Sequence, residues 1–241
     1  MCTILLAWRC LPGVPVVLAA NRDEFLGRPA AAPGVLVEHP RIAGGRDLLA
    51  GGTWMAVAAD GRVAAVTNRR SESRDPERRS RGELPLLVLG AGDDAAVRTL
   101  VTGLDPGAYN PFNLLALSHT QALAAHGAVP LEVVDLAPGP HVVSVHDLDQ
   151  PGEPRIEHLL AALDAAVARA RTPLALLQEM EELLRDPERA CVHGDLYGTV
   201  SSSSVIVPDA GAVTYRHAAG RPCEVAHRDI SDLVLESAPP R

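Results

Sequence analysis

The chain has 241 residues, of which 47% are hydrophobic, 22% are charged and only 3% are aromatic. This composition excludes an intrinsically disordered chain and predicts one globular domain over residues 1–241 with an aliphatic core. The formal net charge of -8 argues against a nucleic-acid partner. Because all 22 basic residues are Arg, chemistry that needs a lysine, such as a Schiff base, is excluded.

The four cysteines, at positions 2, 10, 191 and 223, lack the CxxC spacing of a redox pair or a zinc site. They predict reduced thiols and a cytoplasmic protein rather than a disulfide framework. The apolar N-terminal stretch differs from a signal peptide, because Arg9 and Pro12 interrupt it and no basic region precedes it. No apolar run approaches the roughly 20 residues of a membrane-spanning helix, so we expect no membrane span.

Residues 1–24 predict a β-hairpin, because two short apolar runs flank a turn-forming Pro-Gly pair. With the turn centred between residues 11 and 14, facing residues have numbers that sum to about 25. This register places Cys2 opposite Asp23 and beside Arg22 and Glu24. A thiol at the second position of the chain therefore meets a charged cluster.

A Pro- and Ala-rich stretch, residues 26–42, predicts an extended surface connection. A glycine-rich stretch follows and leads into a hairpin of two strands, 53–58 and 63–67, of which the second ends at Asn68. Residues 69–81 then hold six Arg among Ser, Asp and Glu. A solvated loop of mixed charge is the common interpretation of such a run. The sharper one is a rim that binds an anion, such as a substrate carboxylate or the propionates of a haem.

The second half of the chain alternates helices and strands. Ser80 and Asp93 are N-cap residues for two helices that end near residue 89 and at Gly103. Apolar residues at three- and four-residue spacing predict two longer helices, over 156–170 and 172–185. Strands are expected at 112–117, 121–126, 131–135, 141–146, 199–207 and 212–217. This order is compatible with an α+β fold of two sheets between helical layers.

Seven short motifs follow one another along the chain, namely NRDE (21–24), GGRD (44–47), GGTW (51–54), VTNR (66–69), SRGEL (80–84), YNPFNL (109–114) and YGT (197–199). In these motifs the chain resembles the NRDE family, the transport and Golgi organisation proteins. The resemblance implies the four-layer αββα sandwich of N-terminal nucleophile hydrolases. It also implies a role in cellular haem handling, because the biology of the family is described mostly in those terms. Two positions depart from the family's pattern, because Val200 replaces a usual Arg and His146 a usual Asn.

Removal of Met1 would make Cys2 the first residue, so that one residue carries both the thiol nucleophile and a free α-amine. We predict that the guanidinium of Arg22 lowers the pKa of the Cys2 thiol by about one to three units. The amine then takes the thiol proton and returns it to the leaving group, and Asp23 orients the amine. The common alternative is a small buried Cys beside an ordinary ion-paired turn.

Acyl transfer also needs donors aimed at the developing oxyanion. Asn68, at the end of a strand that can lie beside the hairpin, is the first candidate, and Asn21 is the second. Contact with substrate is assigned to Glu24, Trp54, Arg69 and Arg70, although Trp54 also suits the core.

Two functions stay open at this point. One is an enzyme, an amidohydrolase or acyltransferase that acts on a non-peptide amide through an acyl-Cys2 intermediate and needs no cofactor. The other is a protein on the same fold that binds haem without turnover, although the sequence has no CxxCH or Cys-Pro motif for an axial ligand. Its partner is accordingly a small acyl or amide substrate, or haem. The loop with Cys191 and His193 has no second ligand cluster beside it in sequence, so no metal site is expected.

Overall fold

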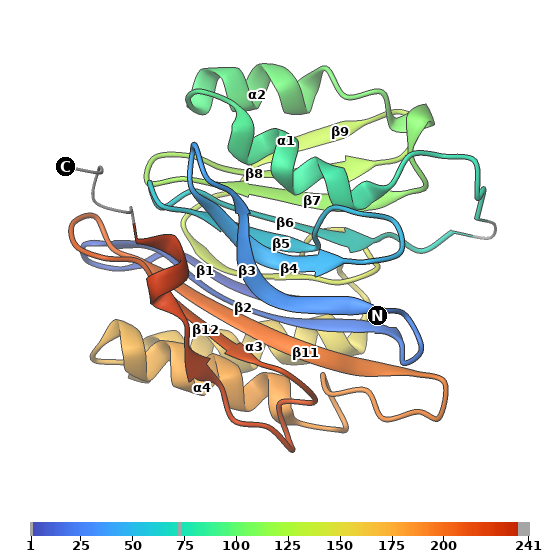
Figure 1. The fold of residues 1–241 in the computed structure, drawn as a ribbon. Coiled ribbons are helices and arrows are strands. Elements are labelled where there is room, and N and C mark those ends of the chain that lie inside the picture. The colour runs from blue at the N-terminus through green and yellow to red at the C-terminus, as the bar shows by residue number, and fades with distance from the viewer. Residues whose placement is uncertain (1, 72–73, 236–241) are drawn as a thin grey trace.

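The computed structural model describes residues 2–71 and 74–235, and these fold into four layers (Figure 1). Two antiparallel sheets pack face to face, and a pair of helices covers the outer face of each sheet. The helices of one outer layer are α1 (Leu84–Gly90) and α2 (Asp94–Thr102), and those of the other are α3 (Pro154–Arg169) and α4 (Pro173–Arg185). The predicted αββα sandwich of the α+β class is confirmed.

The first sheet has six strands in the order β10-β1-β2-β11-β12-β13. Its central strands, β1, β2 and β11, are buried on both faces, between the second sheet and the helices α3 and α4. Strands covered on both faces read as continuous apolar runs, which is why β1 and β2 show little alternation in sequence. The bounds are β1 (Thr3–Leu11), β2 (Val14–Phe25), β10 (Gly139–Val143), β11 (Tyr197–Val207), β12 (Thr214–Ala218) and β13 (Arg228–Asp229).

The second sheet is a meander of seven strands, in which each strand pairs with the next along the chain. Its strands are β3 (Ala30–Val37), β4 (Ile42–Asp47), β5 (Met55–Ala58), β6 (Val63–Asn68), β7 (Phe112–Leu117), β8 (Ala122–Gly127) and β9 (Glu132–Asp135). Short 3-10 turns cover Arg81–Glu83, Pro106–Ala108 and Ser231–Val234. One apolar core lies between the two sheets, and a further core lies between each sheet and its helices.

The segment 26–42 differs from its predicted form, because it contains the edge strand β3 rather than only an irregular connection. The residues of β3 are exposed or half-buried, so the strand lacks the apolar alternation by which strands are recognised. Pro33 is tolerated there because an edge strand has one side without a ladder partner.

The hairpin of β1 and β2 is present, but the predicted register is wrong by one residue. Thr3 pairs with Asn21 and Ile4 with Ala20, whereas the expected register still holds beside the turn, where Leu11 pairs with Val14. A bulge between Trp8 and Leu11 causes the shift. Such a bulge inserts an unpaired residue into one strand, which local turn rules do not reveal. Continued by one residue, the observed register places Cys2 opposite Arg22 and not opposite Asp23.

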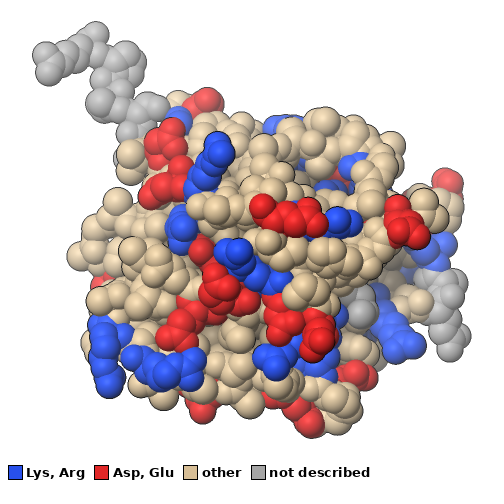
Figure 2. Space-filling model, turned by 90° about the horizontal axis from the view of Figure 1, so that it is seen from below, with Lys and Arg blue, Asp and Glu red and all other residues tan. Residues whose placement is uncertain are grey.

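The surface mixes both signs of charge. Figure 2 views the molecule from the side of α3 and α4 and shows acidic and basic side chains interspersed on that face. Across the residues that the structure describes, no helix combines the length and the apolar character that a membrane crossing requires.

Candidate functional site

A cavity of about 400 Å³ brings the two sheets' polar residues together. Cys2, Arg22 and Asp23 reach it from the first sheet, and Asn68 reaches it from the end of β6 in the second sheet. The expectation that the strand of Asn68 lies beside the hairpin is therefore corrected, because that strand faces the hairpin from the opposing sheet. Other lining residues are Glu24, Phe25, Arg28, Asp47, Trp54, Arg74, Asp75, Arg78, Arg79, Arg81, Asn110 and Tyr197.

The Cys2 thiol is half-buried and donates a hydrogen bond to the backbone carbonyl of Asp23, with a sulfur–oxygen distance of 3.6 Å. Burial, and after it the negative charge of Asp23, raises the pKa of this thiol to about 11. Arg22 acts in the opposite direction, but its effect is the smaller one. The predicted direction of the Arg22 effect is confirmed, but burial and Asp23 outweigh it, so the net pKa is raised and not lowered in the chain that retains Met1. A thiol with such a pKa needs a base before it can attack a carbonyl.

Asp23 is held by the strand β11. Its Oδ1 atom accepts a hydrogen bond of 2.6 Å from the hydroxyl of Thr199, and its backbone carbonyl accepts one of 2.9 Å from the hydroxyl of Tyr197. The Thr199 oxygen itself accepts a hydrogen bond of 2.8 Å from the backbone N–H of Val192. Burial raises the pKa of the Asp23 carboxyl, while the Thr199 donor opposes that shift. The side chain is therefore fixed in orientation by the strand that pairs with its own.

The guanidinium of Arg22 lies over the ring of Trp54, with its Cζ atom 4.1 Å from the ring centroid. This geometry is that of a cation–π contact, so Trp54 contacts a charged group in addition to filling space. Arg22 is only 6% exposed, and burial lowers its pKa. Two large side chains from the two sheets thus form one wall of the cavity.

Part of the arginine-rich segment 69–81 surrounds the same cavity. Arg78 and Arg79 are neutralised by neighbours, because their guanidinium nitrogens lie 3.5 Å from Asp75 and 2.7 Å from Glu83, respectively. Arg81 instead donates to the backbone carbonyl of Pro111 at 2.9 Å. Burial, and then the charge of Arg74, lowers the pKa of Arg81 to about 10. Within the described part of the chain, neither Arg81 nor Arg22 forms an ion pair with a carboxylate.

Three predicted site residues lie outside the cavity lining. The Asn21 amide donates to the carbonyls of Leu184 at 2.9 Å and Ala190 at 3.1 Å, on the side of α4. Arg69 forms a two-bond ion pair with Asp147, with nitrogen–oxygen distances of 2.6 and 2.8 Å. Arg70 is exposed. Glu24 does line the cavity, where its Oε2 atom lies 3.7 Å from the Nε atom of Arg28.

Three further residues belong to the site although the sequence motifs gave them no role, namely Tyr197, Thr199 and Arg155. The first two belong to the YGT motif, so a signal was present for them in the sequence. Arg155 lies in the first turn of α3 and donates a hydrogen bond of 2.9 Å to the hydroxyl of Thr3, the buried residue that follows Cys2 in the chain. No local pattern connects it with a residue 152 positions away. The atypical Val200 lines a smaller neighbouring cavity together with Arg22 and Trp54.

The family model of Transport and Golgi organisation 2 matches residues 1–218. The chain belongs to this family. A homologue of Transport and Golgi organization protein 2 from Bos taurus is 29% identical over 236 residues, covering 83% of this chain and 84% of the relative. The Mus musculus homologue is 26% identical over 234 residues, with coverage of 83% and 84%.

Solved structures of two hydrolases share the fold. The N-acylethanolamine-hydrolyzing acid amidase ortholog of Caenorhabditis elegans superimposes with a TM-score of 0.57 at 11% identity, over 86% of this chain and 93% of that one. A mutant of the conjugated bile acid hydrolase from Clostridium perfringens gives a TM-score of 0.53 at 11% identity, over 98% of this chain and 95% of that one. At this identity the likeness shows the fold alone, which is that of the N-terminal nucleophile hydrolases.

Proposed function

We propose that this member of the Transport and Golgi organisation 2 family hydrolyses a non-peptide amide bond, with Cys2 as its nucleophile after removal of Met1. The observation that carries the proposal is the single cavity in which Cys2, Arg22, Asp23 and Asn68 meet. The names of both fold neighbours denote hydrolases, and one of them is an amidase. The bile acid hydrolase structure is of a mutant in which a cysteine at the second position is replaced by alanine.

The thiol in this site is proposed to need a base, because burial raises its pKa to about 11 in the chain that still carries Met1. Removal of Met1 creates an α-amine on Cys2 itself, and such an amine has an ordinary pKa of about 8, so a useful fraction is neutral near pH 7. The amine takes the thiol proton while the sulfur bonds to the amide carbonyl carbon. The carbon–nitrogen bond then breaks, and the same proton passes to the leaving amine. Water hydrolyses the resulting thioester, which releases a carboxylic acid and restores the thiol.

The other residues have supporting roles in this scheme. The Asp23 carboxylate, fixed by Thr199, accepts a hydrogen bond from the α-amine and orients it. Asn68 lines the cavity, and in this scheme its side-chain amide donates a hydrogen bond to the developing oxyanion. Loss of one such donor reduces kcat by about 100- to 1000-fold in well-studied hydrolases.

The charges of the cavity indicate the substrate class. Arg22 and Arg81 reach the cavity with buried or half-buried guanidinium groups that no carboxylate of the described chain neutralises at ion-pair distance. Glu24 and Asp47 oppose the charge of Arg22, and Glu24 that of Arg81, but only from beyond ion-pair distance. An anionic ligand in direct contact with the guanidiniums lowers the cost of burying them. The substrate proposed is therefore an amide that carries a carboxylate or another anionic group.

The proposal is tested by intact-protein mass measurement followed by reaction with a panel of acyl amides and thioester probes. We expect loss of Met1 and one acyl adduct, which peptide mapping places on Cys2. Cys2→Ala removes the adduct, whereas the matched control Cys10→Ala, at another half-buried thiol, keeps it.

A chain that retains Met1, or that is labelled mainly at Cys191 or Cys223, contradicts this scheme. Haem titration runs in parallel. Saturable one-to-one haem uptake by the wild-type protein, with no acyl adduct from any probe, would favour the alternative of haem binding without turnover.

A further inference from the structure

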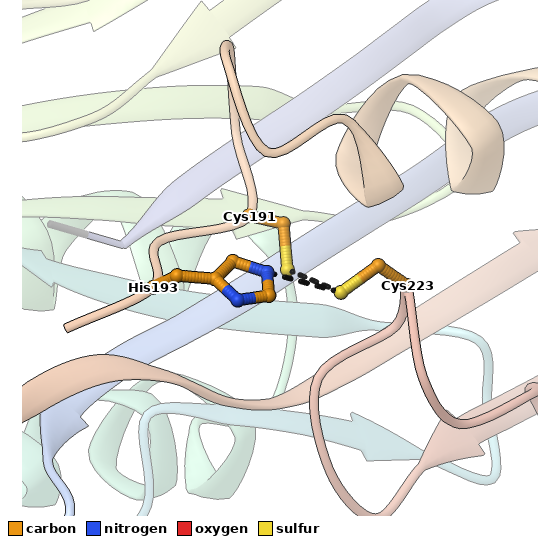
Figure 3. A group of neighbouring side chains, drawn as sticks. All are labelled: Cys191, His193 and Cys223. Atoms are coloured by element: carbon orange, nitrogen blue, oxygen red, sulfur yellow. Dashed lines mark hydrogen bonds between the residues drawn. The ribbon is translucent and has the colours of Figure 1, made fainter. Parts of the chain in front are cut away.

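A second group of chemically active side chains lies where the connection between α4 and β11 meets the loop after β12 (Figure 3). Cys191 and His193 come from the first segment and Cys223 from the second. The two sulfurs are 3.3 Å apart, and the Nε2 atom of His193 lies 3.2 Å from the Cys223 sulfur. Three potential ligand atoms thus converge within 4.8 Å of one another.

We propose that Cys191, His193 and Cys223 bind a single Zn²⁺ ion. Thiolate and imidazole are the usual ligands of zinc, at about 2.3 Å for sulfur and about 2.0–2.1 Å for nitrogen. In a tetrahedral site these bond lengths require a sulfur–sulfur separation of about 3.8 Å and a sulfur–nitrogen separation of about 3.6 Å. The observed separations are shorter by only about 0.4–0.5 Å, which small side-chain rotations supply.

The sequence expectation of no metal site rested on the lack of a second ligand cluster near Cys191 and His193. The fold supplies that partner, because Cys223 lies 32 residues further along the chain and its sulfur meets Cys191. A disulfide explains the arrangement less well. The two sulfurs are 3.3 Å apart and not bonded, since a disulfide requires about 2.05 Å. A disulfide would also not explain why His193 lies beside the Cys223 sulfur.

The exposure of the three residues suits an ion that enters from solvent. Cys191 is buried, Cys223 is half-buried and His193 is exposed, so the cluster has a closed inner end and an open outer end. Three protein ligands leave the fourth tetrahedral position to water or to the exposed Asp195 nearby in sequence.

A metal ion here would connect the two loops that flank β11 and β12, and it would stabilise the wall behind the candidate active site. The residues next to Cys191 already contact this sheet, because Ala190 accepts a hydrogen bond from Asn21 of β2 and Val192 donates one to Thr199 of β11. The Thr199 hydroxyl in turn donates to Asp23. The proposed ion is structural, and its presence does not depend on whether Cys2 is a nucleophile.

The test titrates the full chain, reduced and stripped of metal by a chelator, with Co²⁺ and then with Zn²⁺. We expect one equivalent of Co²⁺ to give a sulfur-to-cobalt charge-transfer absorption, which Zn²⁺ then abolishes. Zn²⁺ also raises the melting temperature, because it binds the folded form. Cys223→Ser and His193→Ala each weaken Zn²⁺ binding at least about tenfold, and neither removes a fully buried residue.

Two control variants separate this site from the rest of the molecule. Cys10→Ser and Cys2→Ser leave Co²⁺ and Zn²⁺ binding unchanged, since their thiols are not part of the cluster. Absence of the cobalt–thiolate absorption overturns the proposal, and so does binding that survives both Cys223→Ser and His193→Ala. Formation of a Cys191–Cys223 disulfide in air, with no metal uptake by the reduced protein, would establish a redox pair in its place.

Discussion

Replacement of Thr199 by valine separates the hydrogen bonds of this residue from its shape, because the two side chains have nearly the same volume. The Thr199 hydroxyl donates to the buried Asp23 carboxylate and accepts from the Val192 N–H. A hydrogen bond to a charged group contributes about 1.5–3 kcal/mol, and a buried N–H without an acceptor costs about 1–3 kcal/mol. The two contributions add to about 2.5–6 kcal/mol. Because Val192 is only half-buried, we expect the lower part of that range, so Thr199→Val lowers the free energy of unfolding by about 2.5–4 kcal/mol.

Urea unfolding measures this loss. With a slope of about 3 kcal/mol per molar urea for a chain of this size, the midpoint falls by about 1 M, and the slope itself does not change. The control is Thr214→Val in β12. Among the residues that the structure describes, the Thr214 hydroxyl has no hydrogen-bond partner. The reasoning is refuted if Thr199→Val shifts the midpoint no further than the control does.

The remaining predictions concern the cavity charge and the pH dependence of stability. Arg81→Met raises KM at least about tenfold for an anionic amide substrate but not for its neutral analogue, and leaves kcat nearly unchanged, because a binding contact alone is lost. Burial lowers the pKa of His217 and His227 to about 4, below the value of about 6.5 for an unfolded chain. Above pH 6.5 each histidine is neutral in both states and costs no stability. As the pH falls toward 4, the unfolded chain binds a proton that the folded chain does not, so the free energy of unfolding declines by about 3 kcal/mol per histidine. His217→Gln flattens this decline in urea midpoints measured from pH 7 to pH 4, and an unchanged decline would contradict the assignment.

Local signals in the sequence predicted most of the helices well, although Ser80 caps the 3-10 turn Arg81–Glu83 and not α1 itself. Asp93 is the N-cap of α2 and Gly103 its C-cap, and Thr172 caps α4 through a hydrogen bond to the Ala175 N–H. The strand at 112–117 was predicted with the observed bounds. Caps and apolar spacing act within a few residues, so the sequence alone contains that information.

Features that depend on distant contacts could not be predicted in the same way. The amide of Asn21 points to α4 because a helix more than 150 residues further along the chain packs on that face of β2. The pairing of Arg22 with Trp54 requires two sheets to face each other. The approach of Cys223 to Cys191 likewise appears only when two loops are placed side by side. In each case the residue types were visible and their partners were not.

The corrected register of the hairpin also changes which side chain shares a face of the sheet with Cys2. In β2 the even-numbered residues from 16 to 20 belong to the core between the sheets, and residues 17 and 19 belong to the core under the helices. Alternation therefore puts Arg22 on the sheet-facing side, over Trp54, and Asp23 on the helix-facing side, where Thr199 holds it. Cys2, opposite Arg22, shares the sheet-facing side, whereas the Asp23 carboxylate lies on the helix-facing side, although its negative charge still acts on the thiol. In the proposed mechanism Asp23 is accordingly assigned to orient the α-amine and not to take the thiol proton.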